Sequence, residues 1–210
     1  VWGERALIQD HYHALTVELA GTGAAHRKVE LEFRAYDAGL AFRYRLPEQA
    51  GLTNVRISRE DTEFRFTADP TTWATHASQA AYSKIKVSET QRALERPLTL
   101  QAADDLFIAI GEAAQIDYPR MKLALLPGSP HDLVSRLDGD AQGHTPLATP
   151  WRVIMVGSRP GALLENNDIF LNLNEPCAIA DTSWIKPGKV IRDVTLTTAG
   201  GKACVDFAVK

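Results

Sequence analysis

Two carboxylates stand out in the stretch GEAAQIDYPRM at residues 111–121. Glu112 follows directly on an apolar run and stands beside Gly111, where the missing side chain lets another group approach the backbone closely. A glutamate at a strand end could project from a sheet rim as an oxygen ligand for calcium, or as part of a sugar site. Asp117 lies on the same stretch. Most carboxylates at strand ends are solvated, and calcium needs about six to eight oxygens, so its other ligands would have to come from elsewhere.

The remaining candidates for chemistry are weaker. None of the six histidines has the i, i+4 spacing of a helical metal site, although His11 and His13 would share one face of a strand. Cys177 and Cys204 lack CxxC spacing, and we expect two free thiols rather than a disulfide. The sequence contains no GxSxG motif and no glycine-rich phosphate loop.

Tryptophans could stack on a sugar ring, because an aromatic face matches the C–H face of a pyranose. Trp151 enters an apolar run after Pro150 and is expected in the core, whereas Trp73 could form a surface platform. Trp184 stands where the sequence pattern changes, and we expect it between two domains.

Composition limits the classes of protein to which this chain can belong. The chain has 210 residues, 45% of them hydrophobic, with a formal net charge of -3, so it is long enough for a full core. Lysine and arginine are scattered rather than clustered, which argues against nucleic acid as a partner. No apolar run approaches the roughly 20 residues that span a bilayer, so no membrane span is expected.

Period-2 alternation predicts the elements that position these residues. Val29, Leu31 and Phe33 alternate with charged residues, and a second alternating run covers residues 40–46. Asp37-Ala38-Gly39 between them predicts a hairpin, with glutamates and arginines opposed across its outer face.

Further short strands are predicted along the chain. They include Leu106–Ile110, Met121–Leu125, Trp151–Val156 and Ile169–Leu173. A helical turn is predicted at Arg159–Glu165 and a long connection with short strands at residues 68–100. Many strands and few helices predict a β-sandwich. After Trp184 the pattern changes to one predicted strand, Val190–Thr198, and the start of a helix, Ala203–Lys210.

Several blocks in collinear order resemble glycoside hydrolase family 97. They are VWGERALIQDHYHAL at the start, GLAFRYRLP at 39–47, IGEAAQIDYPRMKL at 110–123, TPWRVIMVG at 149–157 and LNLNEPCAIADTSWIKPGK at 171–189. The resemblance implies a mainly β fold: a galactose-mutarotase-like β super-sandwich lacking its first strands at residues 1–183, then the truncated start of a catalytic (β/α)8 barrel at 184–210.

The resemblance also implies a function. Members of the family are calcium-dependent, exo-acting α-glucosidases and α-galactosidases, whose catalytic carboxylates would lie beyond residue 210. The sandwich would lend Glu112 to Ca2+ and form a wall of the active site. The implied partners are an oligosaccharide or α-glycoside substrate and the chain's own barrel domain, and the implied location is the periplasm or the exterior of a bacterium. This chain alone would be inactive.

A second hypothesis belongs to another class. The chain could be a stand-alone carbohydrate-binding module that shares the sandwich fold without catalysis, with a surface platform such as Trp73.

Overall fold

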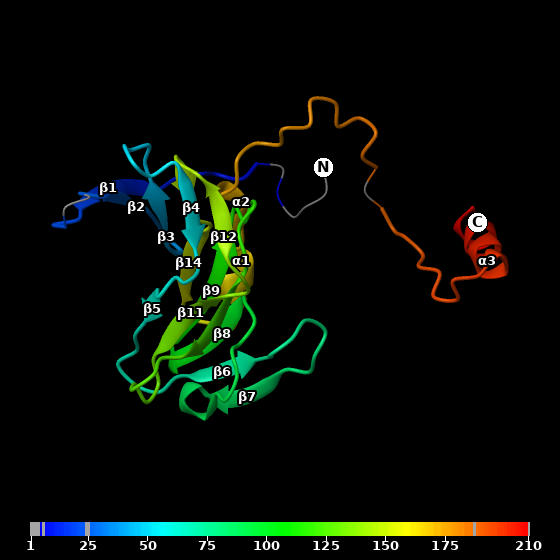
Figure 1. Cartoon of the computed structure of the whole chain (residues 1–210). Coiled ribbons are helices and arrows are strands. Elements are labelled where there is room, and N and C mark those ends of the chain that lie inside the picture. The colour runs from blue at the N-terminus through cyan, green and yellow to red at the C-terminus, as the bar shows by residue number, and fades with distance from the viewer. Residues whose placement is uncertain (1–4, 6, 24–25, 187, 210) are drawn as a thin grey trace. The chain divides into compact units, whose positions relative to one another are not determined.

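Antiparallel strands dominate residues 8–175 of the computed structural model, which describes residues 5, 7–23, 26–186 and 188–209 (Figure 1). The strands are β1 His13–Ala20, β2 Lys28–Tyr36, β3 Gly39–Leu46, β4 Asn54–Ile57, β5 Glu63–Phe64, β6 Thr71–Ala74, β7 Ser83–Lys86, β8 Leu98–Ala103, β9 Leu106–Ala113, β10 Met121–Leu125, β11 Leu133–Leu137, β12 Ala141–His144, β13 Leu147–Ala148 and β14 Trp151–Gly157. The helices are the 3₁₀ turn η1 Val87–Glu89, α1 Pro160–Glu165, α2 Asp168–Asn172 and α3 Thr198–Ala208.

The strands form two layers, as expected for a sandwich. The larger sheet has the order β1-β2-β3-β14-β9-β8-β6-β7, with β13 paired to β3. The smaller sheets β10-β11-β5 and β12-β4 make the second layer. One hydrophobic cluster lies between the layers and includes Leu100, Ile110, Met121 and Leu133. The predicted β-sandwich is therefore confirmed.

The other face of the large sheet packs against the short helices. Trp151, Val153 and Met155 of β14 form a second cluster with Leu163 of α1 and Ile169 of α2. Trp151 is 2% exposed, which confirms its predicted place in the core.

The β2–β3 hairpin follows the predicted pattern. Its register places Glu32 opposite Arg43 and Glu30 opposite Arg45. Gly39 closes the turn with φ of +157°, and a Cβ there would lie 2.2 Å from the carbonyl oxygen of Ile154. A larger residue could not let β3 come this close to β14.

Two predicted strands are wrong. Residues 169–173 form most of α2, because Ile169 and Leu173 lie one helical turn apart and both face the sheet, where each is 3% exposed. Residues 190–197 form no strand, since within the described part of the chain they pair with no other strand. The helix predicted from Ala203 begins earlier, at Thr198, where the Thr197 side chain accepts a hydrogen bond from the N–H of Gly200.

The chain divides into two units. Ile8–Glu175 contains all the strands named above, and the second unit comprises Val1–Leu7 and Pro176–Lys210. Of the second unit's described residues, Thr198–Ala208 is the only helix, and Trp184 is 68% exposed. The proposed boundary between residues 183 and 184 stays a prediction.

Candidate functional site

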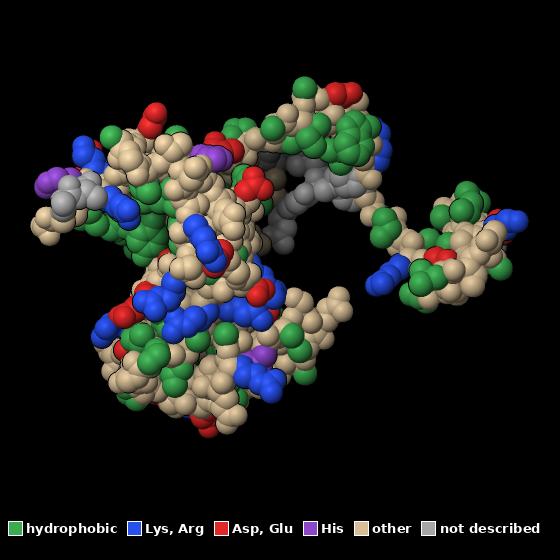
Figure 2. Space-filling view, viewed as in Figure 1, with side chains coloured by type: hydrophobic (Ala, Val, Ile, Leu, Met, Phe, Trp, Pro, Cys, Tyr) green, Lys and Arg blue, Asp and Glu red, His purple; other side chains and the backbone are tan. Residues whose placement is uncertain are grey.

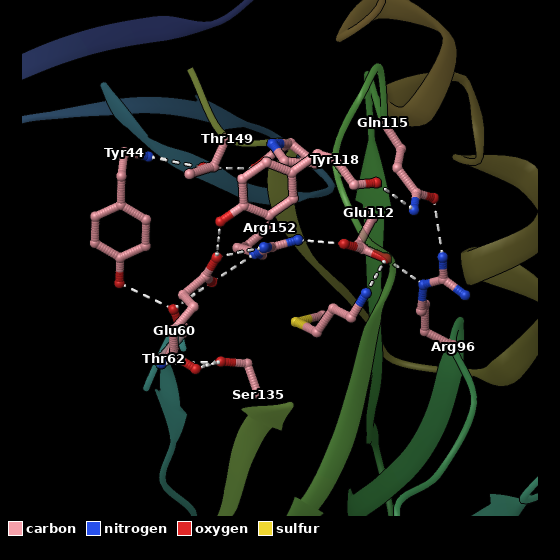
Figure 3. Close-up of polar contacts among 12 residues, drawn as sticks. Tyr44, Glu60, Thr62, Arg96, Glu112, Gln115, Tyr118, Ser135, Thr149 and Arg152 are labelled. Carbon is pink, nitrogen blue, oxygen red and sulfur yellow. Dashed lines mark hydrogen bonds and ion pairs between the residues drawn. The ribbon is translucent and has the colours of Figure 1, made fainter. Parts of the chain in front are cut away.

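Arg152 lies at the centre of a buried charge cluster (Figure 3). It belongs to β14, between β3 and β9, and its side chain is fully buried. Its Nε donates to Glu60 Oε1 at 2.8 Å and its Nη2 to Glu60 Oε2 at 2.5 Å, a bidentate pair. Its Nη1 donates to Glu112. One guanidinium therefore joins two carboxylates from distant parts of the chain.

Glu112 is the second member of the cluster. Strand register places it directly opposite Arg152, and its side chain is 3% exposed. Its Oε1 accepts from Arg152, while its Oε2 accepts from Arg96 Nε and, at 2.9 Å, from the N–H of Met121. Beside it, a Cβ on Gly111 would lie 2.7 Å from the ring of Phe170, which confirms the close approach predicted at this glycine.

Glu60 precedes β5 and brings neutral partners into the cluster. The hydroxyl groups of Thr62 and Tyr118 donate to its carboxylate at 2.8 and 3.3 Å. The Ser135 hydroxyl donates to its backbone carbonyl at 2.5 Å, and Tyr44 shares a 2.9 Å hydrogen bond with Thr62. These bonds connect both layers of the sandwich at one point.

Burial and charge act together on the titrating groups. Burial alone would lower the pKa of Arg152, but the hydrogen bonds and charge of Glu60, with the charge of Glu112, outweigh it and raise that pKa. Burial, followed by the nearby Glu60 charge, raises the pKa of Tyr118 well above its usual value. The arginine is therefore charged and the phenol neutral around pH 7.

A second acidic centre extends the cluster toward the surface. Glu95 is 7% exposed and lies 3.2 Å from Arg120 Nη1 and 3.0 Å from Lys122 Nζ. Arg96, next along the chain, donates to both Glu112 and Gln115. A belt of lysine and arginine with interspersed acidic side chains crosses this face of the molecule (Figure 2).

Calcium does not fit this arrangement with the described residues alone. Both oxygens of Glu112 accept from guanidinium groups, whose charge repels a divalent cation. No group of three or more His, Cys, Asp or Glu side chains in the described ranges could hold a metal ion. Six to eight oxygen ligands would be needed, and Oε1 of Glu112, with one donor, has about one acceptor position left.

The other predicted residues are spread over the molecule. The rings of His11 and His13 lie 6.0 Å apart, in no metal-binding group of the described residues. Cys177 and Cys204 are both free, as expected. Trp73 is half-buried, with Lys84 Nζ 5.3 Å from its ring centre. Asp117 is exposed and lies away from the cluster's hydrogen bonds.

Sequence reasoning missed Arg152 and Glu60. A signal for Arg152 was present, because it alternates with Trp151 and Val153 in an apolar strand and so had to face one of the two packed layers. Glu60 gave no such signal: it lies in the polar stretch SREDTE, where only the tertiary fold selects one acid for burial.

No helix in the described part of the chain has the length and apolar character that crossing a membrane requires.

Known proteins match this chain over most of its length in sequence and over nearly all of it in structure. A sequence profile described as glycosyl-hydrolase 97 N-terminal matches residues 1–176. A retaining alpha-galactosidase of Bacteroides thetaiotaomicron is 25% identical over 89% of this chain and 32% of its own length. A glycoside hydrolase family 97 enzyme of Pseudoalteromonas sp. strain K8, solved with acarbose, is 32% identical with a TM-score of 0.88, over 99% of this chain and 35% of the enzyme.

A variant of the Pseudoalteromonas enzyme, solved in complex with panose, gives the same TM-score of 0.88. This chain thus spans about a third of the length of the relatives it matches.

Proposed function

The chain belongs to the glycosyl-hydrolase 97 N-terminal family, and from this membership we propose that it is the β-sandwich part of an exo-acting, calcium-dependent α-glycoside hydrolase. The observation that carries the proposal is the combined match: the family profile over residues 1–176 and the TM-score of 0.88 with a family 97 enzyme. The relatives' own names add the reaction class, since one is an alpha-galactosidase. We expect hydrolysis of an α-glucoside or α-galactoside.

In this proposal the sandwich supplies a wall of the active site and packs on a catalytic barrel. The chain matches only about a third of the relatives' length, so the catalytic carboxylates are expected in the remaining part of such an enzyme. The buried cluster supports the wall role, because its hydrogen bonds tie the segment before β5 to β9, β11 and β14. We also propose a periplasmic or secreted location.

Glu112 as a ligand of Ca2+ is the more specific part of the proposal. Its support is the family resemblance of the GEA block and the acceptor position left on Oε1. For calcium to bind there, further oxygens must come from other parts of the enzyme, and their negative charge must offset the two guanidinium groups.

Calcium titration tests this role. The enzyme that carries this domain should lose hydrolysis of an aryl α-glycoside on chelation and regain it with added calcium. Glu112→Gln should raise the calcium concentration for half activation by roughly tenfold or more. Glu48→Gln, which changes an exposed carboxylate, is the matched control. Unchanged calcium dependence in folded Glu112→Gln protein would remove Glu112 from the calcium site.

The alternative is a carbohydrate-binding module that works without catalysis. It predicts that this chain alone binds maltooligosaccharides at the half-buried Trp73, so Trp73→Ala should abolish the heat of binding in isothermal titration. The enzyme proposal predicts that Trp73→Ala leaves any sugar binding unchanged.

A further inference from the structure

A polar groove lies between the β4–β12 pair and the loop that follows β9. It is open to solvent, has a volume of about 590 Å³ and is lined by Asn54, Val55, Arg56, Asp117, Gln142, Gly143 and His144. Figure 2 shows that the surface over β4 and β12 is mostly polar. The groove lies beside the buried cluster in sequence, because Asp117 immediately precedes Tyr118, whose hydroxyl donates to Glu60.

Strand register arranges the groove's side chains. Asn54 pairs with His144, and Arg56 pairs with Gln142. Alternate residues of a strand point to the same face, so these four side chains share one face of the β4–β12 ribbon. Gly143 pairs with Val55 between them and faces the opposite side of the ribbon, where a Cβ would lie 2.7 Å from the side chain of Leu147. The result is a small square of hydrogen-bonding groups.

The opposite wall is held in place by the cluster. Asp117 has φ of +48°, a left-handed conformation that aspartate tolerates better than most residues. After Asp117 in the chain, Tyr118 is 9% exposed and its hydroxyl donates to Glu60. Before Asp117, Gln115 accepts a hydrogen bond from Arg96 at 3.0 Å. The loop is therefore anchored on both sides of the exposed Asp117.

Most of these groups have no internal partner. Within the described part of the chain, the side chains of Asn54, Asp117, Gln142 and His144 make no hydrogen bond or ion pair, whereas Arg56 pairs with Asp140 at 2.5 Å. Amides and imidazole can each donate and accept, and the carboxylate accepts. The groove thus offers several unused donors and acceptors that converge from two walls.

Charge selects the class of ligand. Asp140 neutralises Arg56, so the groove has no surplus cation for a phosphate. Asp117 is the single carboxylate in the lining, too few for a divalent cation. A neutral molecule with many hydroxyl groups matches this mixture, because each hydroxyl both donates and accepts.

We propose that this groove is a binding site for a neutral sugar, holding one or two units of an α-linked oligosaccharide. The choice of an α-linked sugar rests on the proposed function. The groove is open to solvent and has no aromatic platform among its lining residues, so affinity should be low, with Kd in the range of about 1–10 mM.

Titration followed by ¹⁵N-HSQC NMR tests the proposal on the chain itself. Maltotriose or melibiose should shift the side-chain amide signals of Asn54 and Gln142 and the backbone signal of Gly143, with saturation in the millimolar range. The double variant Asn54→Ala/Gln142→Ala should weaken binding at least about tenfold, as expected when hydrogen bonds to a ligand are lost. Gln91→Ala, which removes an exposed amide outside the groove, should bind as the unchanged chain does.

Each other outcome overturns the proposal. Absence of shifts at roughly 50 mM sugar, shifts that the double variant retains, or a stronger response to inorganic phosphate than to sugar would each do so. Thermal unfolding of the double variant checks that it is folded. Failure of this proposal is separable from failure of the proposed function. If the enzyme that carries this domain hydrolyses α-glycosides and the double variant leaves its KM unchanged, the groove proposal is wrong while the proposed function stands.

Discussion

The buried cluster and the β2–β3 hairpin both pair glutamate with arginine, but the pairs differ in burial. The hairpin pairs Glu32 with Arg43 at 2.5 Å and with Arg45 at 2.7 Å, and the side chains of Glu32, Arg43 and Arg45 keep 17%, 19% and 41% of their exposure. The cluster pairs Arg152 with Glu60 and Glu112 where every side chain is 8% exposed or less. The geometry of the pairs is similar, but the surrounding solvent is not.

That difference decides what each pair contributes. The hairpin charges keep partial contact with water, which screens them and can solvate a charge whose partner is lost, so each pair should add at most about 1 kcal/mol. A charge in the cluster cannot be solvated, so loss of one partner leaves the other buried and unpaired. The cluster therefore specifies one arrangement of the two layers, whereas the hairpin ladder tolerates change.

Removal of Arg152 should give the largest effect. Arg152→Met keeps most of the side-chain volume but leaves Glu60 and Glu112 without their shared cation, which should cost about 3–5 kcal/mol of unfolding free energy. Urea denaturation measures it. Arg152→Lys keeps the charge but loses the forked guanidinium, so its unfolding free energy should lie between those of Arg152→Met and the unchanged chain. A loss below about 1 kcal/mol for Arg152→Met would show that the buried ion pairs contribute no more to stability than surface pairs do.

Glu112→Gln should give the next largest effect. The neutral amide keeps the shape, but Arg96 and Arg152 lose part of their compensation, and one amide hydrogen now faces a donor. We expect a loss of about 2–3 kcal/mol by urea denaturation without calcium. The control Glu48→Gln should stay within about 0.5 kcal/mol of the unchanged chain. Equal stabilities of the two variants would contradict the geometry around Glu112.

The stability of the buried cluster should depend on alkaline pH through the ionisation of Tyr118. Its folded pKa is raised by burial and by Glu60, above an unfolded value of about 10. The folded state therefore holds its proton where the unfolded state releases it, so this contribution is complete below about pH 10 and is lost as pH rises through the folded pKa. Stability should fall less steeply between about pH 9 and 11 in Tyr118→Phe. Parallel curves for the two proteins would contradict this.

The smallest effect is expected on the hairpin. A double-mutant cycle of Glu32→Gln and Arg45→Gln should give a coupling below about 1 kcal/mol that decreases with added salt. The arginines' hydrogen bonds and charges outweigh burial and lower the pKa of Glu32, so the ladder's contribution is lost as pH falls through that lowered value. A coupling as large as the loss of about 3–5 kcal/mol expected for Arg152→Met would contradict the distinction between the two regions.

The sequence predicted local structure better than it predicted the site. Alternation and the Asp37-Ala38-Gly39 turn were sufficient for the hairpin, because neighbouring residues determine both. Ile169–Leu173 was misassigned because a short apolar run fits strand or helix until the sheet beneath it is known. Glu112 was singled out as a calcium ligand, a role that stays a prediction. Its partner Arg152 lies 40 residues away and Glu60, which shares this arginine, lies 52 residues away, so only the fold brings them together.

The central claim is that this sandwich serves an α-glycosidase. The most direct measurement is the release of 4-nitrophenol from aryl α-galactoside and α-glucoside by the enzyme that carries this domain, beside the matched β-anomers. We predict release from at least one α-glycoside and none from either β-anomer. Release from a β-anomer alone, or from none of the four by folded enzyme with calcium present, would contradict the account.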